Sequence, residues 1–183
     1  MHRKPLLELL DRYRARHPGE AAVVDRIRAL VERHPDCFAR SCAPGHVTGS
    51  AFVVSPDLRH CLLVHHRKLG CWLQPGGHAD GDPDLAGVAL REAREETGLA
   101  RLRFASEAGQ RLPFDLDVHD IPAFGGEPAH EHHDVRFLLI ADPLETPVAS
   151  AESNAVGWFD REKLRDLGVD ASLLRMSDKL PCR

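Results

Sequence analysis

The sequence predicts an α+β domain with a mixed β-sheet, preceded by a helical N-terminal region. Apolar residues near the N-terminus follow helical spacing, and β-branched runs begin at residue 47. Helices and strands then mix without the regular βαβ alternation that is typical of a doubly wound parallel sheet. The length of 183 residues suits one domain plus an appendage. We therefore expect a helical appendage over residues 1–40 and the main domain over residues 41–183.

Two amphipathic helices open the predicted structure. Apolar residues recur at positions i, i+3, i+4 and i+7 from Leu6 to Tyr13, and the same spacing returns from Val23 to Val31. Pro18 separates the two segments. Their apolar faces could cover a second copy of the chain as readily as their own domain, so a homodimer is one expectation.

A strand pair and a third helix are expected next. The runs 47–54 and 61–65 flank a turn, as in two neighbouring strands. After a loop rich in Gly and Pro, Asp82 is the expected N-cap of a helix with Pro83 in its first position. Gly98 is the expected C-cap.

The second half of the chain is predicted to add strands to the sheet. Residues 114–119 alternate strictly and predict a half-buried strand with two Asp and one His on its polar face. Residues 135–141 predict a more buried strand. Between these strands, residues 120–134 are expected to form a long surface loop rich in His. Residues 155–159 predict a short strand, followed by a helix over 161–167.

Composition excludes several classes of partner. The 24 Lys and Arg against 28 Asp and Glu give a net charge of -4, so no overall basic field would attract a nucleic acid polymer. The apolar runs are far shorter than the roughly 20 residues of a membrane-spanning helix. Five cysteines without a C-x-x-C pair, together with no secretion signal near Met1, predict a cytoplasmic protein with reduced thiols.

Three carboxylates are predicted to share one face of the third helix. At 100° per residue, Glu95 and Glu96 lie on either side of Glu92. Like charges at this spacing repel, so a cation would compensate them, and hard oxygen ligands suit Mg²⁺ or Mn²⁺. The alternative is a solvated face with intrahelical pairs such as Arg91 with Glu95. The preceding Gly76-Gly77 pair favours a site, since glycines let the backbone approach a metal or phosphate.

This segment resembles the signature of the Nudix (MutT-like) hydrolases, G-x5-E-x7-R-E-U-x-E-E-x-G-U, where U is aliphatic. Ala93 occupies the first U position as a small apolar residue. Pro83 stands where the signature has its first glutamate, with Asp82 and Asp84 on either side. The remaining signature positions are filled at the required spacing by Gly77, Arg91, Glu92, Glu95, Glu96, Gly98 and Leu99.

The resemblance implies the Nudix fold, an α/β/α sandwich around a mixed sheet. It also implies hydrolysis of a phosphoanhydride in a small nucleotide or nucleoside diphosphate derivative. The expected metal ligands for Mg²⁺ or Mn²⁺ are Gly77, Glu92, Glu95 and Glu96. Arg91 is expected to orient Glu95. Glu95 is the first candidate for the general base and Glu152, ahead of the late strand, is the second.

Histidines are the remaining candidates for contact with substrate. His78 follows the glycine pair, His119 lies on the alternating strand, and His132 lies in the His-rich loop. For that loop a solvated surface, a second metal site and a substrate contact all stay open.

Two further functions remain as alternatives. A Nudix-like module that binds or senses a nucleotide without catalysis is supported by Pro83, and a metal-storage or metal-sensing protein is supported by the histidines.

Overall fold

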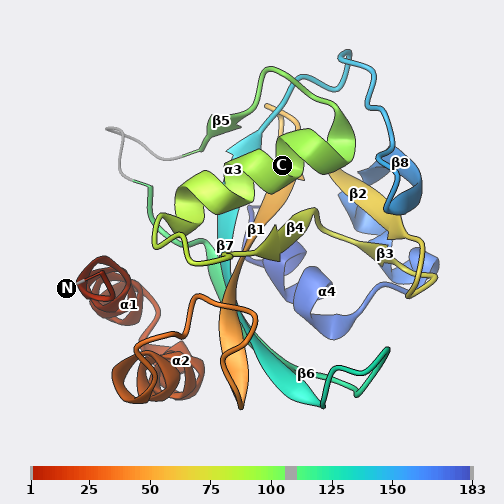
Figure 1. Cartoon of the computed structure of the whole chain (residues 1–183). Helices are drawn as coiled ribbons and strands as arrows, with labels where there is room; N and C mark the ends of the chain where they lie inside the picture. The colour runs from red at the N-terminus through yellow and green to blue at the C-terminus, as the bar shows by residue number, and fades with distance from the viewer. Residues whose placement is uncertain (1, 106–110, 182–183) are drawn as a thin grey trace.

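The protein is a mixed β-sheet with helices on both faces, as expected (Figure 1). The computed structural model describes residues 2–105 and 111–181. Within these residues the sheet has the strand order β3-β2-β1-β7-β5, with β4 paired to β1, β6 to β7 and β8 to β2. The strands are β1 (Gly45–Val54), β2 (His60–His66), β3 (Trp72–Leu73), β4 (Gly76–His78), β5 (Arg103–Phe104), β6 (Asp115–Ile121), β7 (His130–Ile140) and β8 (Ser153–Asp160).

The centre of the sheet is the parallel pair of β1 and β7. The pairing runs without a break from Gly45 opposite Glu131 to Val54 opposite Ile140. The other edge of β1 is shared, because β4 pairs antiparallel near its start and β2 pairs near its end. Residues of β1 are buried along the whole strand, as is typical of a strand covered on both faces.

The two faces of the sheet are covered by α3 (Leu85–Thr97) and α4 (Ala171–Asp178) (Figure 1). A Cβ on Gly49 would lie 2.9 Å from the carbonyl oxygen of Leu85, so the first turn of α3 rests directly on β1. On the opposite face, Arg136 of β7 donates to Ser172 of α4. Alternation along β1 and β7 therefore sends odd-numbered side chains toward α3 and even-numbered ones toward α4.

The N-terminal helices α1 (Lys4–Arg16) and α2 (Ala21–Arg33), joined by the 3-10 turn η1 (Pro18–Glu20), form as predicted. Their apolar residues, such as Leu10 and Ile27, are fully buried in the same core as Val135 of the sheet. These faces are covered by their own chain, which removes the reason to expect them at a dimer interface.

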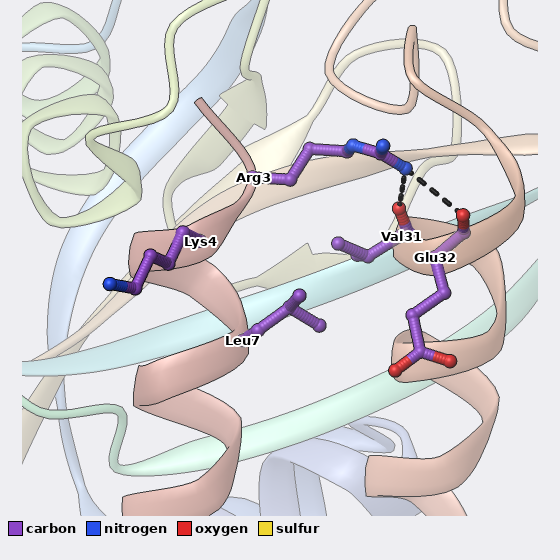
Figure 2. A pocket seen from close by; sticks show the side chains of 5 residues that line it. All are labelled: Arg3, Lys4, Leu7, Val31 and Glu32. Atoms are coloured by element: carbon purple, nitrogen blue, oxygen red, sulfur yellow. Dashed lines mark hydrogen bonds between the residues drawn. The ribbon is translucent and has the colours of Figure 1, made fainter. Parts of the chain in front are cut away.

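The start of α1 is attached to the end of α2. Arg3 donates to the carbonyl oxygens of Val31 and Glu32, which have no partner within the helix at its C-terminus. Figure 2 shows this junction, a shallow pocket that also includes Lys4 and Leu7. None of the residues predicted to bind metal or substrate lines this pocket.

One prediction at a helix end is wrong. The N-cap of α3 is Asp84, whose side chain accepts from the N–H of Gly87, and not Asp82; Asp82 instead accepts from the N–H of Asp84. Gly98 is the C-cap as predicted, with φ of 69°. The helix predicted over 161–167 forms with the same bounds, as the 3-10 helix η3 (Arg161–Leu167).

The predicted surface loop over 120–134 is much shorter. Strand β6 continues to Ile121 and β7 begins at His130, so the three histidines lie on a strand. The hairpin register places His119 opposite His132 and Ile121 opposite His130. Backbone pairing with β1 and β6 extends the strand into polar sequence, which side-chain patterning could not anticipate.

The polar face of β6 is buried at its Asp115 end, although the strand forms as predicted. Asp115 is fully buried and accepts from Arg136 and from Arg175 of α4. Arg136 is 2% exposed and also donates to Asp117 at 3.2 Å and to Asp134 at 2.7 Å. A buried guanidinium thus joins three carboxylates of two strands to α4.

This network reaches the N-terminal helices through Lys179. Its Nζ lies 2.6 Å from Asp115 Oδ1, 2.7 Å from the hydroxyl of Tyr13 and 2.8 Å from Glu20 Oε1. One ammonium group therefore connects the end of α4, strand β6 and the turn between α1 and α2.

Among the described residues, no helix is long and apolar enough to cross a membrane.

We predict that Arg136→Met lowers the free energy of unfolding by about 3–5 kcal/mol, because it leaves buried carboxylates without their partner. Urea denaturation checks this value. Arg165→Met is the control, since the Arg165–Asp178 pair is exposed and should contribute less than about 1 kcal/mol. Equal losses in the two variants would contradict a central role for Arg136.

Acid should unfold the protein partly through Asp117. Burial opposes its ionisation, but the hydrogen bond to His119 and the charges of Arg136 and Arg175 hold its pKa well below the usual range. The unfolded chain then binds a proton first as pH falls, so the stabilisation is complete above about pH 5 and is lost progressively between about pH 5 and pH 1. Asp117→Asn should lose less stability between these values than Asp166→Asn, measured by urea denaturation at each pH.

Candidate metal and substrate site

The carboxylates of α3 lie against the backbone of β4. The N–H of Gly76 donates to Glu96 Oε2 at 2.9 Å. A Cβ on Gly77 would lie 2.5 Å from Glu92 Cδ, so only glycine allows the carboxylate to approach the strand this closely. The structure therefore brings together Gly77, Glu92 and Glu96, which the sequence placed in one metal site.

Negative charge exceeds positive charge at this contact. Glu96 is 9% exposed, and burial raises its pKa to about 7; the Gly76 N–H opposes the rise, while the charge of Glu92 adds to it. A cation placed among these oxygens would relieve the repulsion and the cost of burial. Carboxylate oxygens beside a side-chain-free backbone segment are a donor set that fits Mg²⁺ or Mn²⁺.

Arg91 forms the expected ion pair with Glu95, but it lies closer to Glu92. Its Nη2 donates to Glu92 Oε1 at 2.8 Å, whereas Nε lies 3.9 Å from Glu95 Oε1. The Glu95 side chain is 63% exposed. Arg91 thus holds the carboxylate of Glu92 in place, and Glu95 is free to meet solvent or a ligand.

Glu152 lies just before β8 and is exposed, with its carbonyl oxygen accepting from the N–H of Arg67. Its charge contributes to the raised pKa of Glu96, which indicates that the two carboxylates share this region. Asp82 and Asp84, the neighbours of Pro83, accept from backbone N–H groups at the start of α3.

The three histidines expected to contact substrate do come together. Ring centroids of His78 and His132 are 5.0 Å apart, and those of His119 and His132 are 5.6 Å apart. Two more rings belong to the same group: His130 stacks near His46, with centroids 4.9 Å apart. We call these five residues, His46, His78, His119, His130 and His132, the histidine cluster.

His46 was not predicted from the sequence to belong to the site. It is 3% exposed on β1 and is paired in register with His132. Only the parallel pairing of β1 with β7 shows its importance, and an isolated His at the start of a strand gives no signal of that pairing.

Burial lowers the pKa of His46 to about 4 and that of His132 to about 3, with neighbouring histidines adding to the effect. The third histidine of the run, His133, faces the other side and contacts Glu131 at 3.0 Å.

The carboxylates and the histidine cluster lie on opposite sides of β4. Consecutive strand residues point in opposite directions, so Gly77 faces Glu92 while His78 faces His46. Arg91 also approaches this strand, with its Nη2 3.4 Å from the carbonyl oxygen of His78. Two chemically different groups therefore meet at one short strand.

Comparison with known proteins gives the family. A family profile described as NUDIX domain matches residues 45–179, the segment from β1 through α4. The chain belongs to the Nudix family. Nudix hydrolases generally use divalent metals, in accord with the donor set at Gly77 and Glu92. The match begins after the two N-terminal helices, and none of the curated proteins compared with the chain matches it.

Solved structures confirm the Nudix fold. A Caenorhabditis elegans Ap4A hydrolase in a binary complex aligns with a TM-score of 0.56 and 17% identity, covering 73% of this chain and 93% of that one. The Escherichia coli dihydroneopterin triphosphate pyrophosphohydrolase gives 0.55 and 16%, with 73% and 93% covered. A Nudix family hydrolase from Clostridium perfringens gives 0.53 and 21%, with 73% and 95% covered.

We predict that Gly77→Ala weakens Mn²⁺ binding by about 10–100-fold, because the new methyl group displaces the Glu92 carboxylate. Titration calorimetry of the metal-free protein measures this. Gly157→Ala is the control, since a Cβ there would meet nothing closer than 3.7 Å. Unchanged Mn²⁺ affinity in Gly77→Ala would show that Glu92 does not hold the ion.

Proposed function

We propose that the chain hydrolyses a phosphoanhydride bond in a nucleotide or nucleoside diphosphate derivative, with Mg²⁺ or Mn²⁺ as its cofactor. The observation that carries this proposal is the contact of Glu92 and Glu96 with the Gly76-Gly77 backbone. Family membership supports a hydrolase. A bound divalent ion would neutralise the adjacent phosphate charges and favour a nucleophilic water.

We assign metal binding, positioning and proton acceptance to different residues of α3 and β4. Glu92, Glu95 and Glu96, together with the carbonyl oxygen of Gly77, would hold the metal. Arg91 is a positioning residue, because its hydrogen bond fixes the Glu92 carboxylate. Glu95 is the first candidate for the base that accepts a proton from water, and its exposure leaves it accessible to one. Glu152 is the second candidate.

The histidine cluster supports the assignment of substrate contacts to His78, His119 and His132. Neutral imidazoles donate and accept hydrogen bonds, as phosphate oxygens and base edges require. His119 already contacts Asp117 at 3.1 Å, which orients its ring. Two of the similar structures are named for hydrolysis of Ap4A and of dihydroneopterin triphosphate, and both names are consistent with a small substrate bearing a polyphosphate.

We further infer a cytoplasmic setting, a small-molecule partner, and a division into residues 1–40 and 41–183. The cysteines at 37, 42, 61 and 71 are free, which supports a reducing compartment; Cys182 lies outside the described residues.

The second candidate function is a module that binds or senses a nucleotide without catalysis. It is favoured by Pro83 in place of the signature glutamate, because Asp82 and Asp84 already accept hydrogen bonds from backbone N–H groups.

A substrate panel tests the proposal. Release of phosphate or nucleoside monophosphate is measured for nucleoside triphosphates, ADP-ribose, dinucleoside polyphosphates, NADH and sugar nucleotides, each with Mg²⁺ or Mn²⁺. Turnover that is lost in Glu96→Gln supports the hydrolase. Binding that raises the melting temperature without any turnover supports the sensing module instead, and then Pro83→Glu is the variant to examine.

We predict that Glu95→Gln lowers kcat by about 100-fold or more and changes KM little, because the amide cannot accept a proton. Steady-state kinetics on the best panel substrate measures both constants. Glu162→Gln, an exposed glutamate of η3, is the control. If Glu95→Gln keeps full activity while Glu152→Gln loses it, the base is Glu152.

A further inference from the structure

Three histidines of the cluster converge on one point. His46 of β1 is paired with His132 of β7, and His130 lies two residues earlier on the same face of β7. One ring nitrogen from each of these residues lies within 4.8 Å of the other two. The sheet itself fixes this arrangement, because the parallel β1–β7 register holds two of the rings side by side.

The separation of two of these nitrogens matches that of ligands around one ion. His130 Nε2 lies 3.3 Å from His132 Nε2. A tetrahedral Zn²⁺ with Zn–N bonds of about 2.0–2.1 Å separates its nitrogens by about 3.3–3.4 Å. The two rings therefore need little movement to share a metal.

The tautomer of His130 is suited to the same role. Its Nδ1 lies 2.9 Å from the carbonyl oxygen of Pro128, so Nδ1 carries the proton and donates it. The lone pair is then on Nε2, the nitrogen directed at His132. A backbone carbonyl that orients the ring in this way is the usual outer partner of a metal-binding histidine.

His46 supplies an independent reason to expect a ligand. The side chain is 3% exposed, yet neither Nδ1 nor Nε2 has a hydrogen-bond partner within residues 2–105 and 111–181. Buried polar atoms are normally paired, since leaving them unpaired costs free energy. The rings in contact with His46 are those of three other histidines, His78, His130 and His132, and no carboxylate of the described residues forms a hydrogen bond with it.

We propose that His46, His130 and His132 bind a borderline transition-metal ion such as Zn²⁺, at a site separate from the carboxylates of α3. Imidazole nitrogen suits Zn²⁺, Ni²⁺ and Cu²⁺, whereas Mg²⁺ prefers oxygen. The fourth position is open to water or to His78, whose ring centroid is 5.0 Å from those of His46 and His132. This site does not depend on the proposed hydrolase activity.

Zn²⁺ titration of the full chain tests the proposal. The protein is stripped with EDTA and then saturated with Mg²⁺, which occupies the carboxylates, before calorimetry with Zn²⁺. We expect one Zn²⁺ per chain. In His130→Asn and His132→Asn the dissociation constant should rise by about 100-fold or more, since even the loss of an outer-shell partner costs 10–100-fold.

Two controls separate this site from others. His60→Asn, at the start of β2 and outside the cluster, should bind Zn²⁺ as the wild type does. Glu92→Gln should keep the Zn²⁺ affinity while its Mn²⁺ affinity falls. Zn²⁺ binding that is lost in Glu92→Gln but retained in His130→Asn would overturn the proposal, because the ion would then lie among the carboxylates.

A measurement on the wild type avoids reliance on folded variants. Zn²⁺ should shift the ring ¹⁵N signals of His46, His130 and His132 in nuclear magnetic resonance spectra recorded with saturating Mg²⁺, and leave that of His60 unchanged. The proposal fails if Zn²⁺ shifts none of these three signals, or if inorganic phosphate shifts them and Zn²⁺ does not.

Discussion

The arrangement of this sheet depends on the ion pairs that the buried guanidinium of Arg136 makes with three aspartates. The guanidinium lies among Asp115, Asp117 and Asp134, so a charge that would be costly alone in the interior is compensated on two strands at once. Asp134 is also the acceptor for Thr48 Oγ1 of β1. The network thereby holds β1, β7 and β6 in the register that aligns the histidines farther along the same face.

Strand β4 determines what the two candidate sites have in common. This strand has only three residues. Gly76 and Gly77 contact the glutamates of α3 on one side of the strand, and His78 contacts the other histidines on the opposite side. Oxygen donors and nitrogen donors are thus kept apart by a single layer of backbone. A change in this strand would alter both groups, whereas a change in α3 or β7 would alter only one.

Local chemistry predicted much of this molecule. The amphipathic helices, the Gly98 cap and the spacing of Glu92 and Glu96 are all properties of neighbouring residues, and sequence shows them directly. The polar face of β6 and the strand beginning at His130 depend on α4 and on pairing with β1, which are distant in sequence. His46 was missed for the same reason, since its partner lies 86 positions later.

Lys179 at the end of α4 joins that helix to the N-terminal helices through its hydrogen bonds to Tyr13 and Glu20. The N-terminal helices leave the ribosome long before residue 179 is made. During synthesis, the Tyr13 hydroxyl and the Glu20 carboxylate are therefore without the Lys179 ammonium group that they contact in the folded protein. A contact between residues so far apart in the sequence forms slowly, because the intervening chain loses conformational entropy before the contact is made. The Lys179 contacts therefore form only after residue 179 has been made, and loss of Lys179 or of the segment that carries Tyr13 and Glu20 would break them.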